Sequence, residues 1–298
     1  MAWFEGFDAG FHEVNGVQIF ARTGGRRHGP PLLLMHGFPQ THAIWHRVAQ
    51  RLAERFFLVM PDLRGYGDSS KPEGLDDHFN YSKRAMAADM AALMHSLGHE
   101  RYGVVGHDRG GRVAHRLALD HSAAVKRLMV IDIAPTLDMY DATDMRFARY
   151  YYHWFHLIQP APLPEKMIGG DPAFYLHWKL GGWGAGGTSF IEPDAMAEYR
   201  RCFCRSEAIH AACEDYRASA GIDLDHDRAS RERGQKVACD MRLLWGSRGI
   251  IAALFDPIAL WRAQCSGQVS GRAVEAGHFI PEELHELTAA EITEFMSS

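Results

Sequence analysis

The sequence has no excess of positive charge. Its 32 lysine and arginine residues are outnumbered by 37 aspartate and glutamate residues, which gives a net charge of -5. Surfaces that bind nucleic acid are usually strongly basic, so we expect no nucleic-acid partner. The chain also has no apolar run of about 18 residues, the length that a membrane-spanning helix needs, and its first residues lack the basic flank and apolar stretch of a signal peptide. These absences predict a cytoplasmic protein that does not contact a membrane.

Cysteine is scarce as well. The five cysteines are too few and too irregularly spaced for a disulfide framework or a paired Cys-x-x-Cys metal site, and we expect them to be reduced and mostly buried. The rest of the composition is ordinary for a globular protein, with 47% hydrophobic and 23% charged residues. A length of 298 residues suits one large α/β domain, or a core domain that carries an insertion.

Apolar runs alternate with helical patterns along much of the chain. An Asn-Gly pair at Asn15–Gly16, between two alternating runs, predicts an antiparallel hairpin at the start. Buried strands are expected at 31–35, 56–60, 104–106, 127–132, 241–245 and 268–275, with helices near 45–54, 83–97 and 282–296. Alternation of this kind indicates a mostly parallel, doubly wound sheet with helices on both faces.

The alternation stops between about residues 135 and 236. This stretch contains long helical patterns rich in aromatic residues and histidine, interrupted by prolines and glycine pairs, and it shows no strand pattern. We therefore predict a core domain formed by residues 1–134 and 237–298, and a helical cap domain formed by residues 135–236.

A strand-to-helix turn at Gly106–Gly110 is the strongest catalytic signal. A short apolar strand turns through glycines directly into a helix, which raises Asp108 above the end of the sheet. This is the pattern of a nucleophile elbow, with aspartate in the position that serine often occupies. A carboxylate there can attack carbon and form an ester. The alternative is that Asp108 only caps the following helix.

Two other loops supply candidate partners for this aspartate. His278 follows a glycine at the end of the final predicted strand, where the chain order nucleophile, acid, histidine places a general base. The sequence contains 18 histidines, so the position and not the residue type carries this assignment. Phe38 follows an earlier strand, and its backbone N–H can join that of Arg109 to form an oxyanion hole.

The sequence leaves two aspartates as candidates for the acid that orients His278. Many α/β hydrolases place this acid after the strand that is 241–245 here, but the loop Gly246–Ile250 contains no carboxylate. Asp132, at the end of the preceding strand, is the first candidate, and Asp256 is the second. Either residue could instead cap the segment that follows it.

Arg109 and Arg112 form a basic pair next to Asp108. They are three residues apart at the start of a predicted helix, so they share a face beside the positive end of its dipole. An anion would relieve the repulsion between the two guanidinium groups, and a planar carboxylate matches their geometry. The pair therefore indicates a carboxylate substrate. The alternative is a structural ion pair, with Asp108 as one possible partner.

These motifs occur together in a known family. From end to end the sequence resembles the fluoroacetate (haloacetate) dehalogenases of the α/β-hydrolase superfamily. The matching segments are His36–Gln40, Pro61–Ser69, Gly106–Arg112, Asp132–Pro135, His153–Trp154, Cys213–Arg217 and Gly277–Pro281. The first two segments are shared with epoxide hydrolases and haloalkane dehalogenases. The Asp-Arg-x-x-Arg elbow combined with a His-Trp pair is far more specific.

The resemblance implies an eight-stranded α/β-hydrolase fold and a role for each matching residue. Asp108 would be the nucleophile, His278 the base and Asp132 the acid that orients it. The implied binding residues are Arg109 and Arg112 for the substrate carboxylate, His153, Trp154 and Tyr216 for the halide, and Trp183 for the substrate entrance. The resemblance also implies a homodimer that acts on a small haloacid with no metal or organic cofactor.

Other interpretations stay open. An epoxide hydrolase would use the same aspartyl ester but would need tyrosines to protonate an alkoxide, and the candidates are Tyr150, Tyr151, Tyr152 and Tyr216. A receptor of the same fold could bind a small carboxylate without turning it over. The aromatic residues assigned to the halide could also serve only to pack the cap, as most aromatic residues in helices do.

Overall fold

The computed structural model describes residues 3–184 and 186–297. In this part of the chain an eight-stranded sheet has the order β1-β2-β4-β3-β5-β6-β7-β8. The strands are β1 (Phe7–Val14), β2 (Val17–Gly25), β3 (Pro31–Met35), β4 (Phe57–Pro61), β5 (Tyr102–His107), β6 (Val125–Ile131), β7 (Asp240–Gly246) and β8 (Val269–Val274). Strand β2 is antiparallel to both of its neighbours, and the other neighbouring pairs are parallel. The mostly parallel sheet predicted from the sequence is confirmed.

Strands β1 and β2 form the predicted hairpin. Asn15 and Gly16 connect them, and Val14 pairs with Val17 on either side of the turn. Both turn residues have positive φ angles, 49° for Asn15 and 77° for Gly16. A two-residue turn of this type requires positive φ at both positions, and asparagine and glycine adopt it most readily.

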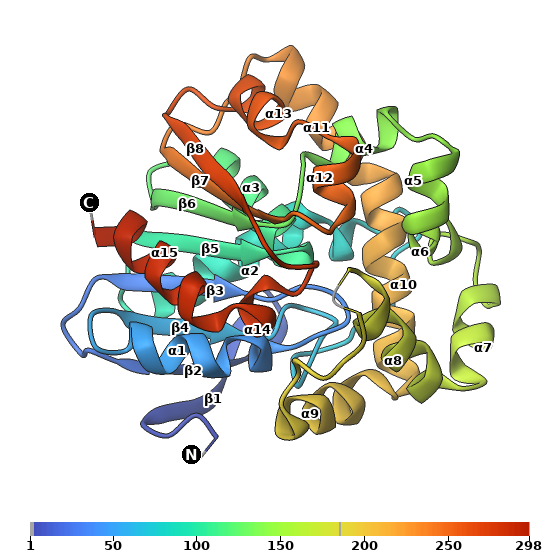
Figure 1. The fold of residues 1–298 in the computed structure, drawn as a ribbon, viewed down its shortest axis with the longest axis horizontal. Helices are drawn as coiled ribbons and strands as arrows, with labels where there is room; N and C mark the ends of the chain where they lie inside the picture. The colour runs from blue at the N-terminus through green and yellow to red at the C-terminus, as the bar shows by residue number, and fades with distance from the viewer. Residues whose placement is uncertain (1–2, 185, 298) are drawn as a thin grey trace.

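Helices cover both faces of the sheet (Figure 1). On one face α1 (His46–Leu52) packs against α15 (His285–Ser297), above a core that includes Val105. On the other face α2 (Lys83–Ser96) packs against α3 (Arg109–Asp120), above a core that includes Val104. Because successive residues of a strand point to opposite faces, β5 is buried on both sides, which explains its uninterrupted apolar run.

The chain between β6 and β7 is helical. Its helices are α4 (Thr136–Asp141), α5 (Met145–Tyr150), α6 (Tyr152–His156), α7 (Leu163–Gly169), α8 (Pro172–Gly182), α9 (Pro193–Phe203), α10 (Ser206–Ala220) and α11 (Ile222–Glu232). In Figure 1, α5 to α10 lie together at the right-hand end of the sheet. The prediction of a helical stretch without strands agrees with this arrangement.

The remaining helices are short connections around the sheet. They are the 3-10 helices η1 (His42–Trp45) and η2 (Phe79–Tyr81), and the α-helices α12 (Ile250–Leu254), α13 (Pro257–Gln264) and α14 (Ile280–Glu283). The prediction of one continuous helix over 282–296 is wrong, because the chain breaks between α14 and α15 at Leu284, where φ is -133° and ψ is 53°. The break allows Glu283 to accept hydrogen bonds from the backbone N–H groups of Gly277 and Phe279, at 2.7 and 3.0 Å, while α15 packs on α1.

Cysteine side chains, apolar helices and possible metal ligands each bear on a prediction from the sequence. All five cysteines are free thiols, and Cys202, Cys213 and Cys265 are buried. Among the described residues, no helix has the length and apolar character needed to cross a membrane. Residues 3–184 and 186–297 also contain no cluster of three or more His, Cys, Asp or Glu side chains arranged to hold a metal ion.

Candidate active site

Asp108 lies at a sharp turn between β5 and α3. Its backbone angles, φ 47° and ψ -114°, are unusual for a residue with a side chain. The surrounding glycines make this turn possible: a Cβ on Gly106 would lie 2.4 Å from the carbonyl oxygen of Gly110, and a Cβ on Gly37 would lie 2.4 Å from the Cβ of Asp108. Asp108 makes no side-chain hydrogen bond to the start of α3, so the structure gives no support to the capping alternative.

The two carboxylate oxygens of Asp108 have different surroundings. Oδ1 accepts a hydrogen bond of 2.9 Å from the backbone N–H of Phe38, whereas Oδ2 lies 3.7 Å from Nε2 of His278. Burial alone would raise the pKa of Asp108, but His278, His107 and the nearby arginines outweigh burial and lower it. Asp108 is therefore a buried carboxylate that stays ionised, as a nucleophile must.

His278 is held between two carboxylates. Its Nδ1 lies 2.6 Å from Oδ2 of Asp132, and its Nε2 faces Asp108. Asp132 is itself fixed by a hydrogen bond of 2.9 Å from the backbone N–H of Gly246 to its Oδ1. Burial lowers the pKa of His278, but the hydrogen bond and charge of Asp132 outweigh burial and raise it. Of the two candidate acids, the structure brings Asp132 to the histidine, whereas Asp256 caps α13 through the N–H of Ala259 at 3.0 Å.

Arg109 is paired with a carboxylate that the sequence did not indicate. Its Nε lies 2.9 Å and its Nη2 2.7 Å from the carboxylate oxygens of Asp215 in α10. Lys83 also pairs with Asp215, and the hydroxyl of Tyr66 donates to it at 2.5 Å. Nη1 of Arg109 remains buried without a hydrogen-bond partner. The structural ion pair is therefore real for Arg109, but its partner is Asp215 and not Asp108.

The sequence contained one weak pointer to Asp215. It precedes Tyr216 in the segment Cys213–Arg217 that resembles the dehalogenases. An aspartate within a predicted amphipathic helix is usually solvent-exposed, so the residue type alone predicts nothing special. In the structure Asp215 is fully buried, and the cationic groups of Arg109 and Lys83 outweigh this burial and lower its pKa.

Arg112 is buried without a carboxylate partner. Its guanidinium donates to the carbonyl oxygen of Ala134 at 3.2 Å, to Oγ1 of Thr136 at 2.8 Å and to the sulfur of Met139 at 3.4 Å. All three acceptors are neutral, and Nε has no partner. Burial, reinforced by the charge of Arg109, lowers the pKa of Arg112. A buried guanidinium of this kind is costly unless an anion neutralises it, which makes Arg112 a candidate anion site beside Asp108.

Three aromatic side chains of the helical stretch carry polar atoms without partners. His153 Nδ1, Trp154 Nε1 and Tyr216 Oη are buried and make no hydrogen bond. The rings of His153 and Tyr216 have centroids 5.5 Å apart. Buried donors are normally satisfied, so a group of three without partners suggests a binding site and not simple packing.

These three residues lie next to the two arginines. The guanidinium carbon of Arg109 lies 4.2 Å from the centroid of the Tyr216 ring, and that of Arg112 lies 4.7 Å from the Trp154 ring. The structure thus brings together Asp108, both arginines and the predicted aromatic residues, although they come from the β5–α3 turn, α3, α6 and α10. The resulting site offers buried donors and positive charge to a small anion near Asp108.

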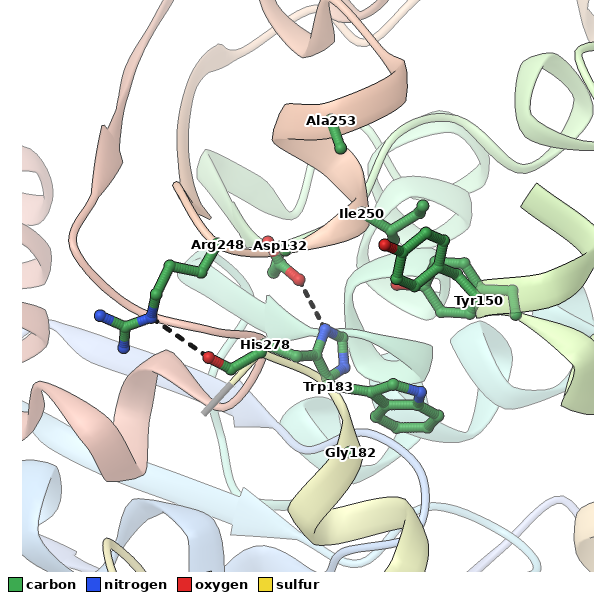
Figure 2. A pocket seen from close by; sticks show the side chains of 11 residues that line it. Asp132, Tyr150, Gly182, Trp183, Arg248, Ile250, Ala253 and His278 are labelled. Atoms are coloured by element: carbon green, nitrogen blue, oxygen red, sulfur yellow. Dashed lines mark hydrogen bonds and ion pairs between the residues drawn. The ribbon is translucent and has the colours of Figure 1, made fainter. Parts of the chain in front are cut away.

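Trp183 lies between His278 and His153. Its ring centroid is 4.7 Å from that of His153 and 5.1 Å from that of His278, and its carbonyl oxygen accepts a hydrogen bond of 2.9 Å from the N–H of His278. Figure 2 shows Trp183 below the His278–Asp132 pair, at the edge of a cavity of about 240 Å³. The cavity is lined by Asp132, Tyr150, Tyr151, Gly182, Trp183, Gly184, Arg248, Gly249, Ile250, Ala253 and His278. Trp183 thus lines this cavity together with His278, and its place at a substrate entrance stays a prediction.

The four tyrosines that could serve an epoxide hydrolase are not equivalent. Tyr150 is 61% exposed and Tyr152 is 38% exposed. Tyr151 and Tyr216 are buried, and burial raises the pKa of each well above 10. The charges of Asp132 and Asp108 reinforce this rise for Tyr151, and the charge of Asp108 reinforces it for Tyr216. The charge of Asp108 acts on both of these buried hydroxyl groups, so they are the candidates for proton donation.

The fold and the elbow define the class of this protein. The chain belongs to the α/β-hydrolase family, since the family described as alpha/beta hydrolase fold matches residues 30–234. It is 45% identical to the fluoroacetate dehalogenase of a Burkholderia species, over 99% of this chain and 95% of that protein. The chain is thus a hydrolase homologous to fluoroacetate dehalogenase.

Two other relatives show how far the similarity extends. A soluble epoxide hydrolase of Corynebacterium sp. (strain C12) is 34% identical over 91% of this chain and 90% of that protein. A solved structure from Nostoc sp. PCC 7120, ascribed to the α/β hydrolases, has 50% sequence identity and a TM-score of 0.94, and it covers 98% of both chains. Dehalogenases and epoxide hydrolases are therefore both relatives, and the residues of the site must distinguish the two reactions.

Proposed function

We propose that this protein hydrolyses a haloacetate, fluoroacetate or chloroacetate, to glycolate and halide through an ester on Asp108. The observation that carries this proposal is the buried guanidinium of Arg112, which lies beside Asp108 and donates only to neutral acceptors. An epoxide brings no charge that would neutralise it, whereas a haloacetate brings a carboxylate. The similarity to a fluoroacetate dehalogenase supports the same reaction.

In the first step, Oδ2 of Asp108 attacks the carbon that carries the halogen. A carbon–oxygen bond forms, the electron pair of the carbon–halogen bond leaves with the halide, and the carbon is inverted. Oδ2 fits this role because Oδ1 is already occupied by the N–H of Phe38. Arg112 and the unpartnered Nη1 of Arg109 hold the substrate carboxylate during the attack.

In the second step, His278 removes a proton from a water that attacks Cγ of the ester. Asp132 keeps Nδ1 protonated, so that Nε2 is the basic nitrogen. The carbonyl oxygen of the ester is Oδ1, and the N–H groups of Phe38 and Arg109 stabilise its negative charge as the water adds. As the intermediate collapses, the bond between Cγ and Oδ2 breaks, and His278 passes its proton to Oδ2, which leaves as the hydroxyl oxygen of glycolate. The second proton of the water is lost to solvent, which restores the carboxylate of Asp108 and the neutral His278.

The halide departs toward His153, Trp154 and Tyr216. Fluoride is small and strongly hydrated, so its departure is costly unless donors replace water as the charge develops. Imidazole N–H, indole N–H and phenol O–H supply such donors. Burial and neighbouring cations hold the pKa of His153 well below 6.5, so its ring donates as a neutral group.

Epoxide hydrolysis is the second candidate, because Tyr151 and Tyr216 place two buried hydroxyl groups near Asp108. Incubation with fluoroacetate, chloroacetate and an epoxide distinguishes the two reactions. We expect fluoride or chloride ions and glycolate from the first two compounds, and no diol from the third. Diol formation without halide release would favour the epoxide hydrolase, and binding of the haloacetates without turnover would favour a receptor.

Assembly and domain division follow from the same resemblance. We assign residues 135–236 to a cap domain and residues 1–134 and 237–298 to the core domain, and we expect a homodimer. Apolar side chains exposed on α7 and α8 support an interface there; they are Leu163, Met167, Phe174 and Trp178. Sedimentation of the protein should give the mass of a dimer, and replacement of Phe174 and Trp178 by serine should shift it toward the monomer.

A further inference from the structure

Lys179, on α8, is buried inside the helical stretch. Its side chain is only 1% exposed. Its ammonium nitrogen lies 3.6 Å from the ring centroid of Tyr152, 5.2 Å from that of Trp183 and 5.6 Å from that of Tyr175. Three aromatic rings therefore surround the charge. Rings attract a cation through their electron-rich faces, although each supplies much less than a carboxylate does.

No carboxylate neutralises this lysine. Within residues 3–184 and 186–297, Lys179 forms no ion pair or hydrogen bond, and burial, the only cause that acts on it, lowers its pKa to about 7. Lysine is almost never fully buried unless it is paired. A buried ammonium without a partner reduces stability, so its presence at this position calls for a functional explanation.

The lysine is adjacent to the proposed halide site. Trp183, one wall of the aromatic cage, has its ring 4.7 Å from the ring of His153. After burial, the charge of Lys179 is the strongest influence that lowers the pKa of His153. Burial and, after it, the charge of Lys179 therefore keep His153 neutral, and Lys179 adds a positive charge near one of the donors that would face a departing halide.

The charges of the reaction match the unpaired cations of the site. Before the first step there are two negative charges, one on Asp108 and one on the haloacetate carboxylate. Afterwards there are again two, because the ester is neutral at Asp108 but the halide carries a charge. Arg109 is already paired with Asp215, so among the described residues Arg112 and Lys179 are the cations around the reacting groups that have no carboxylate partner. Arg112 balances the charge that stays, and Lys179 is placed to balance the charge that leaves.

We propose that Lys179 determines halide specificity: its caged ammonium stabilises the halide as it leaves, through His153 and Trp183, and most strongly for fluoride. The proposal rests on the proposed dehalogenase function. Fluoride has the most concentrated charge of the halides, so it gains most from a nearby cation in a site with little water. Lys179 acts through its neighbours and is a positioning and electrostatic residue, not the nucleophile or base.

Two substitutions separate charge from shape. Lys179→Met keeps the length of the side chain and removes its charge, and Lys179→Arg keeps the charge. We expect Lys179→Met to lower kcat for fluoroacetate relative to chloroacetate by about tenfold, which corresponds to ~1.4 kcal/mol in the barrier, and to weaken product inhibition by added halide ions. Lys179→Arg should recover part of both. Lys166→Met, at an exposed lysine on α7, is the matched control and should change neither.

Thermal unfolding tests whether the lysine is merely structural. If the cage exists to stabilise the helices, Lys179→Met should lower the Tm. If the charge is retained for function, the apolar variant should keep or raise the Tm while it loses fluoride selectivity, because an unpaired buried charge has been removed. A lower Tm combined with an unchanged ratio of fluoroacetate to chloroacetate turnover would overturn the proposal.

The pH dependence of halide inhibition provides a third readout. The titratable groups near Lys179 are Tyr152, His153 and His156 on α6 and Tyr175 on α8, and none of these is a carboxylate. As the pH rises through about 7, Lys179 loses its proton, and halide inhibition of the wild type should weaken. In Lys179→Arg the charge persists, so the inhibition should not weaken over this range.

The outcomes also distinguish this inference from the proposed function. A wild-type protein that releases no halide from any haloacetate contradicts the dehalogenase function, and the role of Lys179 is rejected with it. The other outcome is that the wild type turns over both haloacetates and that Lys179→Met changes neither selectivity nor halide inhibition. That result would reject the role of Lys179 and leave the dehalogenase function intact.

Discussion

Two sides of the site differ in how far their side chains are held by hydrogen bonds: the core side, formed by the strand ends, and the cap side, formed by α6 and α10. On the core side, at the ends of β5, β6 and β8, Asp108, Asp132 and His278 are joined by hydrogen bonds to one another or to the backbone. On the cap side, Nδ1 of His153, Nε1 of Trp154 and Oη of Tyr216 have no hydrogen-bond partner, whereas on the core side Nε2 of His278, which faces Asp108, also lacks one. The two sides are equally buried, so exposure does not explain the difference.

This difference indicates that the core side holds its own side chains in a fixed orientation, whereas the cap side keeps donors available for a ligand. A nucleophile and its base need fixed orientation, and hydrogen bonds between them supply it. A site for a small anion needs donors that are free until the anion arrives, and an unsatisfied buried donor costs about 1–3 kcal/mol. That cost is tolerated where a ligand offsets it. We therefore expect changes on the core side to stop the reaction, and changes on the cap side to alter its selectivity.

The largest effect should come from the base. His278→Asn should halt the cycle after ester formation, because alkylation of Asp108 needs no base and hydrolysis does. Turnover should fall by roughly 10³-fold or more, as for the loss of a general base in other hydrolases. With chloroacetate, the mass of the intact variant should rise by one glycolyl group, with one chloride released for each site. A variant with neither the adduct nor the burst, beside an active wild type, would contradict the assigned roles.

The next largest effect should come from the arginine without a carboxylate partner. Arg112→Lys keeps the charge but loses the planar pair of donors, and kcat/KM should fall on the order of ten- to a hundred-fold. Arg109→Lys should also lose activity, but part of its loss will reflect the broken pair with Asp215, so its Tm should fall further than that of Arg112→Lys. Equal kinetics for Arg112→Lys and the wild type would show that Arg112 does not bind the substrate carboxylate and has only a structural role.

A smaller effect, on selectivity, should come from the cap donors. Trp154→Phe keeps most of the bulk and removes the indole N–H, and it should reduce fluoroacetate turnover several-fold more than chloroacetate turnover. Tyr216→Phe should do the same. Rates of halide release measured for both substrates test this expectation. Equal losses would indicate packing, and faster fluoride release would exclude the donor role.

The smallest effect concerns pH. Burial lowers the pKa of His278, but Asp132 outweighs burial and raises it above 6.5, and only the unprotonated histidine can accept a proton from water. The hydrolysis step should therefore slow as the pH falls through this raised pKa. The chloride burst of His278→Asn should lack that dependence, since alkylation uses no base. If the chloride burst of His278→Asn slowed at low pH in the same way as wild-type hydrolysis, a group other than His278 would control the pH dependence.

Much of the core could be predicted because its signals are local. The elbow needs glycines next to Asp108, and a parallel strand needs an uninterrupted apolar run, and both are visible over a few residues. Asp132 was identified partly by elimination, since the loop after β7 contains no carboxylate. The residue lies in the structure with a positive φ of 54° and its carboxylate 2.6 Å from His278.

The cap features that were missed depend on contacts between distant parts of the chain. Asp215 meets Arg109 across 106 positions of sequence, and nothing near either residue predicts the pair. In the sequence, Lys179 looks like an ordinary charged residue of an amphipathic helix. The packing of α6 against α8 shows that it is buried among aromatic rings, with no carboxylate partner in the described residues. The break at Leu284 likewise accompanies hydrogen bonds that Glu283 accepts from the loop of His278, and such bonds cannot be recognised in a helical sequence pattern.

A single turnover in oxygen-18 water tests the central claim, that the carboxylate of Asp108 and not water displaces the halide. The enzyme in excess over fluoroacetate or chloroacetate should place one labelled oxygen in Asp108 and release unlabelled glycolate, because the oxygen transferred to the product comes from the aspartate. Mass analysis of the peptide that contains Asp108, together with that of glycolate, gives both results. Labelled glycolate and an unlabelled peptide would show direct attack by water and contradict the aspartyl-ester mechanism.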